Sequence, residues 1–291
     1  FGALFTEEDH RGRGLATRLI RESVAILHKR GIAWGGVFST ENALRIYRKL
    51  GFTIPGYADR YLFLKSGEAF FNVHIRSKSL SCFLNVLYMG AIKVIYKVFF
   101  SGRWFRGKSH CKLMLEECDE YNGIAFQEKI KNSTRFRFND SIVKLNWKIG
   151  GCGQKGENIC KPYIIKVSAT NEIVGYCVVR NKLQIEPIAS KYKNFMMMTL
   201  MDYGLFVDDE RLYLSIIDKL FDLFWESSAE VFEVVSNSET LCAALRRKGM
   251  LRVGKGMSFK FSLPESWSIS DGYEQLENWH LTHFCGDSFT F

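Results

Sequence analysis

The sequence predicts an α/β protein built on a mixed β-sheet (α+β mixed sheet), and three observations support this class. Strand-like and helix-like segments alternate through residues 1–65, and they alternate again between residues 198 and 249. Hydrophobic residues make up 47% of the 291-residue chain, which is enough for a sizeable core and argues against disorder. The length fits roughly two domains.

Five elements are predicted in residues 1–65. Both helices end before a glycine, the residue type that most often follows a helix, and the second begins at an asparagine, a good N-cap. In chain order these are a strand over 1–6, a helix over 15–30 whose inner face holds Leu15, Leu19, Ser23 and Leu27, a strand over 32–38, a helix over 42–50 starting at Asn42, and a strand over 57–65.

Two further regions follow. Residues 66–108 are predicted to be a helical connector, and residues 109–291 a second domain. That domain is expected to hold a helical stretch around 119–131, strands at 162–168 and 173–180, a strand–helix–strand–helix series from 198 to 249, and strands near 256–263 and 278–284.

The net charge bears on the class of binding partner, and the cysteines and histidines bear on the compartment and on metal binding. The net charge of +9 permits an anionic partner, but the sequence has no Lys/Arg run and no patch of interleaved aromatic and basic residues, so nucleic acid is not expected. The eight cysteines form no C-x-x-C pair and no secretory signal is seen, which predicts reduced thiols in the cytoplasm. His280, His283 and Cys285 lie at the chain end without a fourth ligand, so no metal is predicted.

Residues 82–100 are the most apolar segment of the connector. They include Lys93 and Lys97, which would be unfavourable inside a bilayer. We therefore expect an amphipathic helix packed on a domain, with peripheral membrane contact through 82–100 as the alternative.

The stretch HRGRGLATRLI, residues 10–20, places two glycines directly before a helix. A helix N-terminus leaves backbone N–H groups unpaired and carries partial positive charge, so an anion binds there when no side chain blocks the approach. Gly12 and Gly14 lack a Cβ, and Arg11 and Arg13 add positive charge. An anion cradle and a purely structural turn both fit this loop.

The pattern Arg11-x-x-Gly14-x-Ala16 resembles the pyrophosphate loop of the GNAT superfamily of acyl-CoA-dependent N-acyltransferases. The later stretch NALRIYRKLGF, residues 42–52, resembles the second motif of that superfamily, with Asn42, Tyr47, Lys49, Gly51 and Phe52 at matching positions. The close resemblance covers residues 1 to about 65. It implies a GNAT-type fold, of which the chain would carry only the C-terminal part of the first copy, so we expect an N-terminally truncated chain.

The resemblance also implies roles for individual residues. The cofactor, acetyl-CoA, would be a co-substrate, and Tyr47 would be the general acid that protonates its thiolate. Glu7, Glu8 and Asp9 are interpreted as solvated loop charges, so no general base is assigned. The cofactor-binding residues implied are Leu4, Phe5 and Thr6 along the pantetheine, Arg11, Gly12, Arg13, Gly14, Leu15 and Ala16 around the pyrophosphate, and Asn42 beside the cofactor.

A repeat relates the two halves of the chain. Gly51 and Gly249 lie 198 positions apart, and the same offset without gaps brings the predicted helices and strands of both halves into correspondence. The second domain therefore resembles a divergent GNAT-like copy. Its loop differs, because Asp209, Glu210, Arg211 and Leu212 replace the glycines and arginines, and Leu245 replaces Tyr47. These acids would repel a pyrophosphate, so the second copy is predicted not to bind CoA.

Two functions are predicted. The first is an N-acetyltransferase that transfers acetyl from acetyl-CoA to an amine of a small molecule or peptide, by direct attack. The alternative is a non-catalytic GNAT-fold protein that binds CoA or serves as a membrane-associated scaffold. The oligomeric state does not follow from the sequence.

Overall fold

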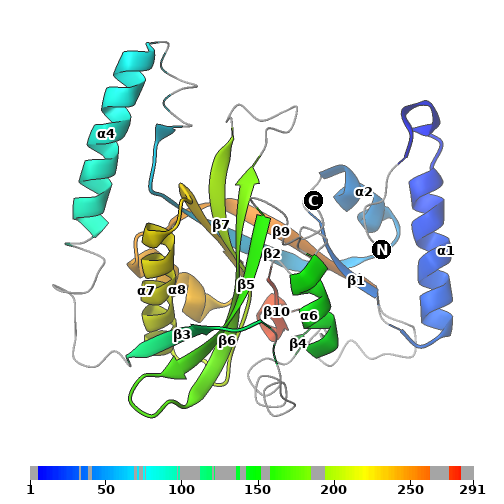
Figure 1. Ribbon diagram of the computed structural model, residues 1–291. Helices are drawn as coiled ribbons and strands as arrows, with labels where there is room; N and C mark the ends of the chain where they lie inside the picture. The colour runs from blue at the N-terminus through cyan, green and yellow to red at the C-terminus, as the bar shows by residue number, and fades with distance from the viewer. Residues whose placement is uncertain are drawn as a thin grey trace.

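The computed structural model describes residues 6–32, 34–38, 41–68, 71, 75, 77–96, 98, 112–119, 121, 136–137, 142–151, 158–184, 194–262 and 275–282. Its centre is an eight-stranded mixed sheet in the order β1-β9-β2-β8-β7-β6-β5-β3 (Figure 1). The strands are β1 Trp34–Phe38, β2 Thr53–Leu64, β3 Leu113–Glu117, β5 Asn158–Val167, β6 Ile173–Gln184, β7 Phe195–Leu205, β8 Val231–Ser236 and β9 Leu251–Ser262. The β7·β8 pair is parallel, and the other neighbours in the sheet pair antiparallel. Two short strands, β4 Phe136–Arg137 and β10 Trp279–His280, pair with each other in parallel.

Helices cover both faces of the sheet (Figure 1). They are α1 Leu15–Lys29, α2 Glu41–Lys49, α4 Lys78–Ile95, α6 Ile142–Gly151, α7 Glu210–Glu226 and α8 Glu239–Arg247, with short 3₁₀ turns η1 Glu8–His10 and η4 Leu276–Asn278. Because strand side chains alternate between faces, Cys177 and Val179 of β6 pack with α7 and α8, whereas Tyr176 and Val178 pack with α6.

The main core lies between the sheet and α7 and α8. Phe221, Phe224 and Phe232 are fully buried there, and Phe63 of β2 packs edge-on against Phe221 with ring centroids 4.8 Å apart. Each such side chain contributes about 1.5–3 kcal/mol by leaving water. This core therefore joins a strand from the first half of the chain to helices from the second.

The predicted repeat is confirmed by the element boundaries. The offset of 198 maps α2 onto α8 and β2 onto β9 residue for residue. Gly51 and Gly249 follow the two helices with φ of 77° and 80°, a left-handed conformation that favours glycine. The next residue in each copy donates its backbone N–H to an equivalent carbonyl, Phe52 to Tyr47 and Met250 to Leu245. The two halves are thus built alike through their last four elements.

The two copies exchange their last strands. β9 of the second copy pairs with β1 of the first, β2 of the first copy pairs with β8 of the second, and β2 and β9 pair with each other between them. Side chains of β9 therefore reach the core of the first copy, and side chains of β2 reach the core of the second. The segments predicted as separate domains contribute to one sheet, and the boundary at residue 65 stays a prediction.

Four details differ from the sequence-based predictions. The face of α1 that is buried centres on Ile20, with Val24 and Leu27 beside it, whereas Leu15 and Leu19 are 45% and 48% exposed. The reason is that α1 packs against Tyr47 and Phe52, and this contact selects a face rotated from the predicted one.

The helix α2 begins at Glu41, so Asn42 lies inside the helix and is not its N-cap. Of the helix predicted around 119–131, Asp119 and Tyr121 are described and are not helical, and the remainder lies outside the described residues. The strand predicted over residues 1–6 also lies outside them, apart from Thr6, which belongs to no strand.

Candidate functional site

The loop before α1 is exposed and contains two glycines in the left-handed region. Gly12 has φ 78° and Gly14 has φ 73°. A Cβ added at either position would meet no described atom within 4 Å apart from those of the adjacent residues. The glycines suit the backbone conformation, because an L side chain is strained at positive φ, and among the described residues no close packing requires them.

Gly14 is the N-cap of α1 and offers no side chain to accept a hydrogen bond from the first turn. The N–H groups at the start of this helix, from Leu15 and Ala16 onward, are the ones that an anion can bind. The first helical bond runs from the N–H of Arg18 to the carbonyl of Gly14 at 3.0 Å. The loop residues 11–15 at this helix start are exposed, so a ligand can approach the N–H groups of the first turn.

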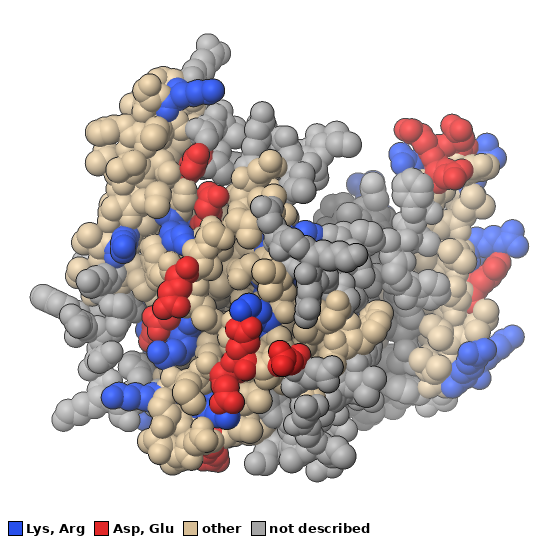
Figure 2. Space-filling model, viewed as in Figure 1, with Lys and Arg blue, Asp and Glu red and all other residues tan. Residues whose placement is uncertain are grey.

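The charges of the loop are mixed. Arg11 donates from Nε to the carbonyl of Thr6 at 3.2 Å, and its Nη1 lies 3.7 Å from Glu8 Oε1. Figure 2 shows acidic and basic side chains next to each other where this loop meets α1. Arg13 is exposed beside them. Of the other predicted cofactor residues, Leu4 and Phe5 lie outside the described residues.

Tyr47 lies on the inner face of α2 and is 3% exposed. Its ring meets the ring of Phe52 edge-on, with centroids 5.0 Å apart, and both pack against Ile20 of α1. The helix that carries the loop and the helix that carries the tyrosine therefore share one small core. Asn42 lies in the same helix as Tyr47, and its side chain lies outside the described residues.

Lys260 of β9 lies beside Tyr47, and no sequence pattern singled it out. Its side chain is fully buried, and Nζ lies over the Tyr47 ring at 5.1 Å from the centroid. Burial lowers the pKa of Lys260 to about 8, because the charged ammonium loses hydration. The strand exchange brings it there, since Lys260 pairs with Gly36 of β1.

The signal in the sequence was the alternation Phe259-Lys260-Phe261. Taken alone, it predicts a strand with one apolar face and one solvent face. Phe259 and Phe261 do pack together with Trp279 on one side of the sheet. Lys260 points to the opposite side of the sheet, where Tyr47 of the first copy covers it. This burial could be foreseen only by knowing that the two copies exchange strands.

The start of α7 is built differently from the start of α1. Asp209 is its N-cap, and its carboxylate accepts a hydrogen bond from the N–H of Arg211 at 2.7 Å. Asp208 accepts from Thr240 at 3.2 Å, and Glu210 forms an ion pair with Arg247 at 2.8 Å. The helix start is therefore capped by the protein's own carboxylate, and negative charge surrounds it.

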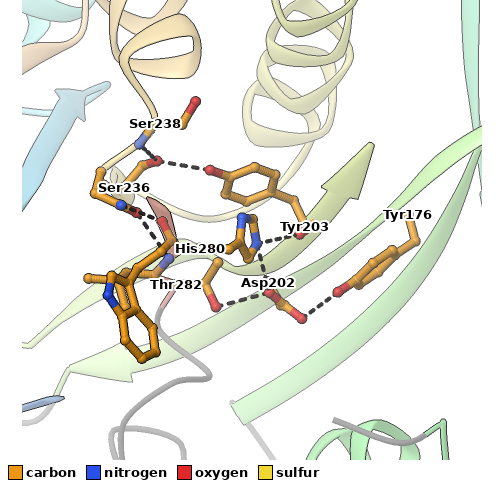
Figure 3. Close-up of polar contacts among 10 residues, drawn as sticks. Tyr176, Asp202, Tyr203, Ser236, Ser238, His280 and Thr282 are labelled. Atoms are coloured by element: carbon orange, nitrogen blue, oxygen red, sulfur yellow. Dashed lines mark hydrogen bonds and ion pairs between the residues drawn. The ribbon is translucent and has the colours of Figure 1, made fainter. Parts of the chain in front are cut away.

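In the second copy, side chains connect the ends of β7 and β8. Their parallel pairing runs from Met197 and Val231 to Leu200 and Val234, and beyond this point side chains link the two strands. The hydroxyls of Tyr203 and Ser236 lie 2.9 Å apart (Figure 3). By the offset of 198, the next residues of β7, Asp202 to Gly204, correspond to Leu4 to Thr6 of the first copy.

The segment 279–282 lies against the end of β7, at Asp202 and Tyr203. His280 Nε2 lies 2.9 Å from the carbonyl of Tyr203, and Thr282 donates to Asp202 at 2.9 Å (Figure 3). Tyr176 also donates to Asp202, at 2.7 Å. Asn237, which follows β8, bonds the carbonyl of Trp279 and the N–H of Leu281.

Asp202, His280 and Thr282 are each less than a tenth exposed. The buried polar groups of this network satisfy one another, which stabilises the segment in place. His280 is thus a member of this hydrogen-bond network. Among the described residues, no group of three or more His, Cys, Asp or Glu side chains could hold a metal ion.

A cavity of about 730 Å³ lies beside α8 in the second copy. Its charged lining pairs internally, because Arg252 bonds Asp59 at 2.7 Å and Arg246 bonds the Tyr61 hydroxyl at 2.8 Å. Glu210 and Glu239 also line it. The cavity therefore does not present a uniformly positive surface to an anionic ligand.

Residues 1–54 match the family model for the acetyltransferase (GNAT) domain. A search of curated proteins finds no match. Among solved structures, a GCN5-related N-acetyltransferase from Anabaena variabilis has a TM-score of 0.54 at 13% identity, over 88% of this chain and 52% of that one. N-myristoyltransferase from Saccharomyces cerevisiae, solved with myristoyl-CoA, has a TM-score of 0.52 at 10% identity, over 90% and 62%.

A probable N-acyltransferase from Enterococcus faecalis gives 0.50 at 8% identity, over 90% of this chain and 53% of that chain. The chain thus spans 52–62% of the length of these three proteins. Residues 1–54 are thus similar to the acetyltransferase (GNAT) domain, and the fold of the chain is similar to the folds of these three proteins.

Proposed function

We propose that this protein is an acyl-CoA-dependent N-acetyltransferase whose first copy is the active one. The observation that carries the proposal is a contrast within the chain. The first copy has a left-handed glycine loop, a helix start without a side-chain cap, and the buried Tyr47. The second copy has a carboxylate cap at Asp209 and a leucine in place of the tyrosine.

The pyrophosphate of acetyl-CoA binds the N–H groups at the start of α1, with Arg11 and Arg13 adding charge. Leu4, Phe5 and Thr6 pair with the pantetheine, and Asn42 lies beside it, as in the family the motifs resemble. In the second copy, the equivalent backbone of Tyr203 is bonded to His280. This arrangement supports binding of one CoA per chain, in the first copy.

The reaction is acyl transfer by direct attack. The amine nitrogen forms a bond to the thioester carbonyl carbon, an oxyanion develops, the C–S bond breaks, and the amine loses a proton to solvent. The departing thiolate takes the phenolic proton of Tyr47. Lys260, whose ammonium lies over the Tyr47 ring, stabilises the negative charge that this transfer leaves on the phenol.

The acceptor is an amine of a small molecule or peptide. The test is release of CoA thiol by the full-length protein from acetyl-CoA, with a panel of amino sugars, polyamines and peptides that carry a free N-terminal amine. We expect release that depends on one class of amine. Binding of acetyl-CoA without release for any amine would favour the non-catalytic alternative, and no binding would refute the proposal.

A further inference from the structure

In its first half, the helix α4 presents the polar side chains of Ser81 and Asn85 to the protein, while Ile92 near its end packs against the main core; most of its other apolar side chains point outward. Asn85 Oδ1 accepts hydrogen bonds from the N–H of Gly67 at 2.9 Å and from Ser66 at 3.2 Å. One turn later, Tyr88 donates to the carbonyl of Leu64 at 3.1 Å. Polar contacts with residues 64–67 thus fasten the inner face of this helix.

The outer face is apolar over four turns. Phe83, Val86 and Val94 are 59%, 63% and 62% exposed, and Leu80 and Leu87 are about half exposed. A helix of a water-soluble protein normally shows the opposite arrangement, with the apolar face inward. The sequence analysis expected an amphipathic helix packed on a domain; α4 is attached to the body, but most of its apolar surface is not covered by the described residues.

By length and composition α4 could cross a membrane, since its 18 residues have a mean hydropathy of 1.3 and 11% of them are buried. The attachment argues against crossing. Asn85 and Tyr88 hold the middle of the helix to the protein body, so a spanning α4 would draw residues 64–67 into the hydrocarbon. The geometry fits a helix that lies along a surface, and Figure 1 shows it at one edge of the molecule.

The surrounding sequence has one sign of charge. Between Glu68 and Glu116 there are eight Lys and Arg residues and no Asp or Glu. Lys78 begins α4, and Lys93 lies in its last turn. Figure 2 shows a largely uncharged surface in the region of α4, with basic and some acidic side chains beside it. Apolar side chains flanked by cations complement an anionic lipid surface, because the hydrophobic and electrostatic contributions act together.

We propose that the outer face of α4 binds the surface of an anionic lipid bilayer, with Phe83, Leu87 and Val94 inserted at the boundary between headgroups and acyl chains. This binding is independent of the proposed acetyltransferase activity. It would hold the protein at a membrane, where its amine acceptor is taken from the surface or from the adjacent solution.

The test is co-sedimentation of the full-length protein with phosphatidylcholine vesicles, with and without phosphatidylserine. The variant Phe83→Gln/Leu87→Gln removes apolar surface without changing charge, and Ile26→Gln is the matched control because Ile26 is 53% exposed on α1. We expect binding to vesicles with phosphatidylserine, at least about tenfold weaker binding for the double variant, and no change for the control.

A second pair, Val86→Gln/Val94→Gln, keeps the test valid if the first variant folds poorly, and circular dichroism checks both. Three outcomes would overturn the proposal. These are no binding to either vesicle type, binding that neither α4 variant weakens, and a wild-type dimer in sedimentation velocity that either variant converts to a monomer. The last outcome would assign the face to a second copy of the chain.

Discussion

Replacing Lys260 with methionine is predicted to raise stability and lower activity. Methionine keeps a similar length without the charge, so the packing against Tyr47 is largely retained. The wild-type ammonium is fully buried, and its pKa falls from 10.5 to about 8. Each pKa unit corresponds to about 1.36 kcal/mol, so burial of the charge destabilises the folded state by about 3 kcal/mol at pH 7.

The effect has a defined pH dependence. The folded state holds the Lys260 proton less tightly than the unfolded chain does, so the destabilisation is fully present below pH 8. It declines as pH rises from about 8 to 10.5, where the unfolded chain still binds the proton and the folded protein does not. At pH 9.5 we expect about 1.5 kcal/mol to remain.

The assay is denaturant unfolding of wild type and Lys260→Met at pH 7 and pH 9.5, with thiol release measured on the same samples. Lys248→Met is the control, because Lys248 is also buried and its ion pair with Asp218, at 2.5 Å, is known. That control should destabilise the protein, since it leaves a carboxylate without its cation. The reasoning would be refuted if Lys260→Met were less stable than wild type at pH 7, or if the difference did not change with pH.

Three further predictions follow from the site. Gly14→Asp should abolish acetyl-CoA binding in calorimetric titration because it adds a carboxylate at the helix start, and it should lower the melting temperature modestly because an L side chain is strained at φ 73°; unchanged affinity would contradict the loop assignment. Tyr47→Phe should lower kcat by roughly 10²-fold with little change in acetyl-CoA affinity, and an unchanged kcat would make Tyr47 structural. Asn237→Ala should destabilise the protein by about 1–3 kcal/mol in urea unfolding, because it removes the bonds to Trp279 and Leu281; a change within error would mean that the segment 279–282 is held by other contacts.

The elements with strong local signals could be predicted from the sequence. Glycine after an apolar-periodic run marked the ends of the helices near Gly31 and Gly51, and the match of Gly51 to Gly249 found the repeat. These signals work because a left-handed residue after a helix is a local requirement of the backbone. The glycine loop before α1 was found in another way, from its two glycines and two arginines and from its resemblance to a family motif.

The features that depend on distant pairing could not be predicted. The exchange of β2 and β9 places Lys260 over Tyr47, although 213 positions separate them, and no local pattern encodes that contact. The segment 279–282 beside Tyr203 is a similar case, because its hydrogen bonds form only in the assembled sheet. The outward apolar face of α4 could not be predicted either, because it depends on the hydrogen bonds of Asn85 and Tyr88 to residues 64–67.

The most direct test of the central claim is the stoichiometry of acetyl-CoA binding to the full-length protein, measured by calorimetric titration. We expect one site per chain, lost in Gly14→Asp and retained when Asp209 is replaced by asparagine, because the second copy takes no part in CoA binding. Two equivalent sites per chain, or a single site that survives Gly14→Asp, would contradict the assignment of the active copy.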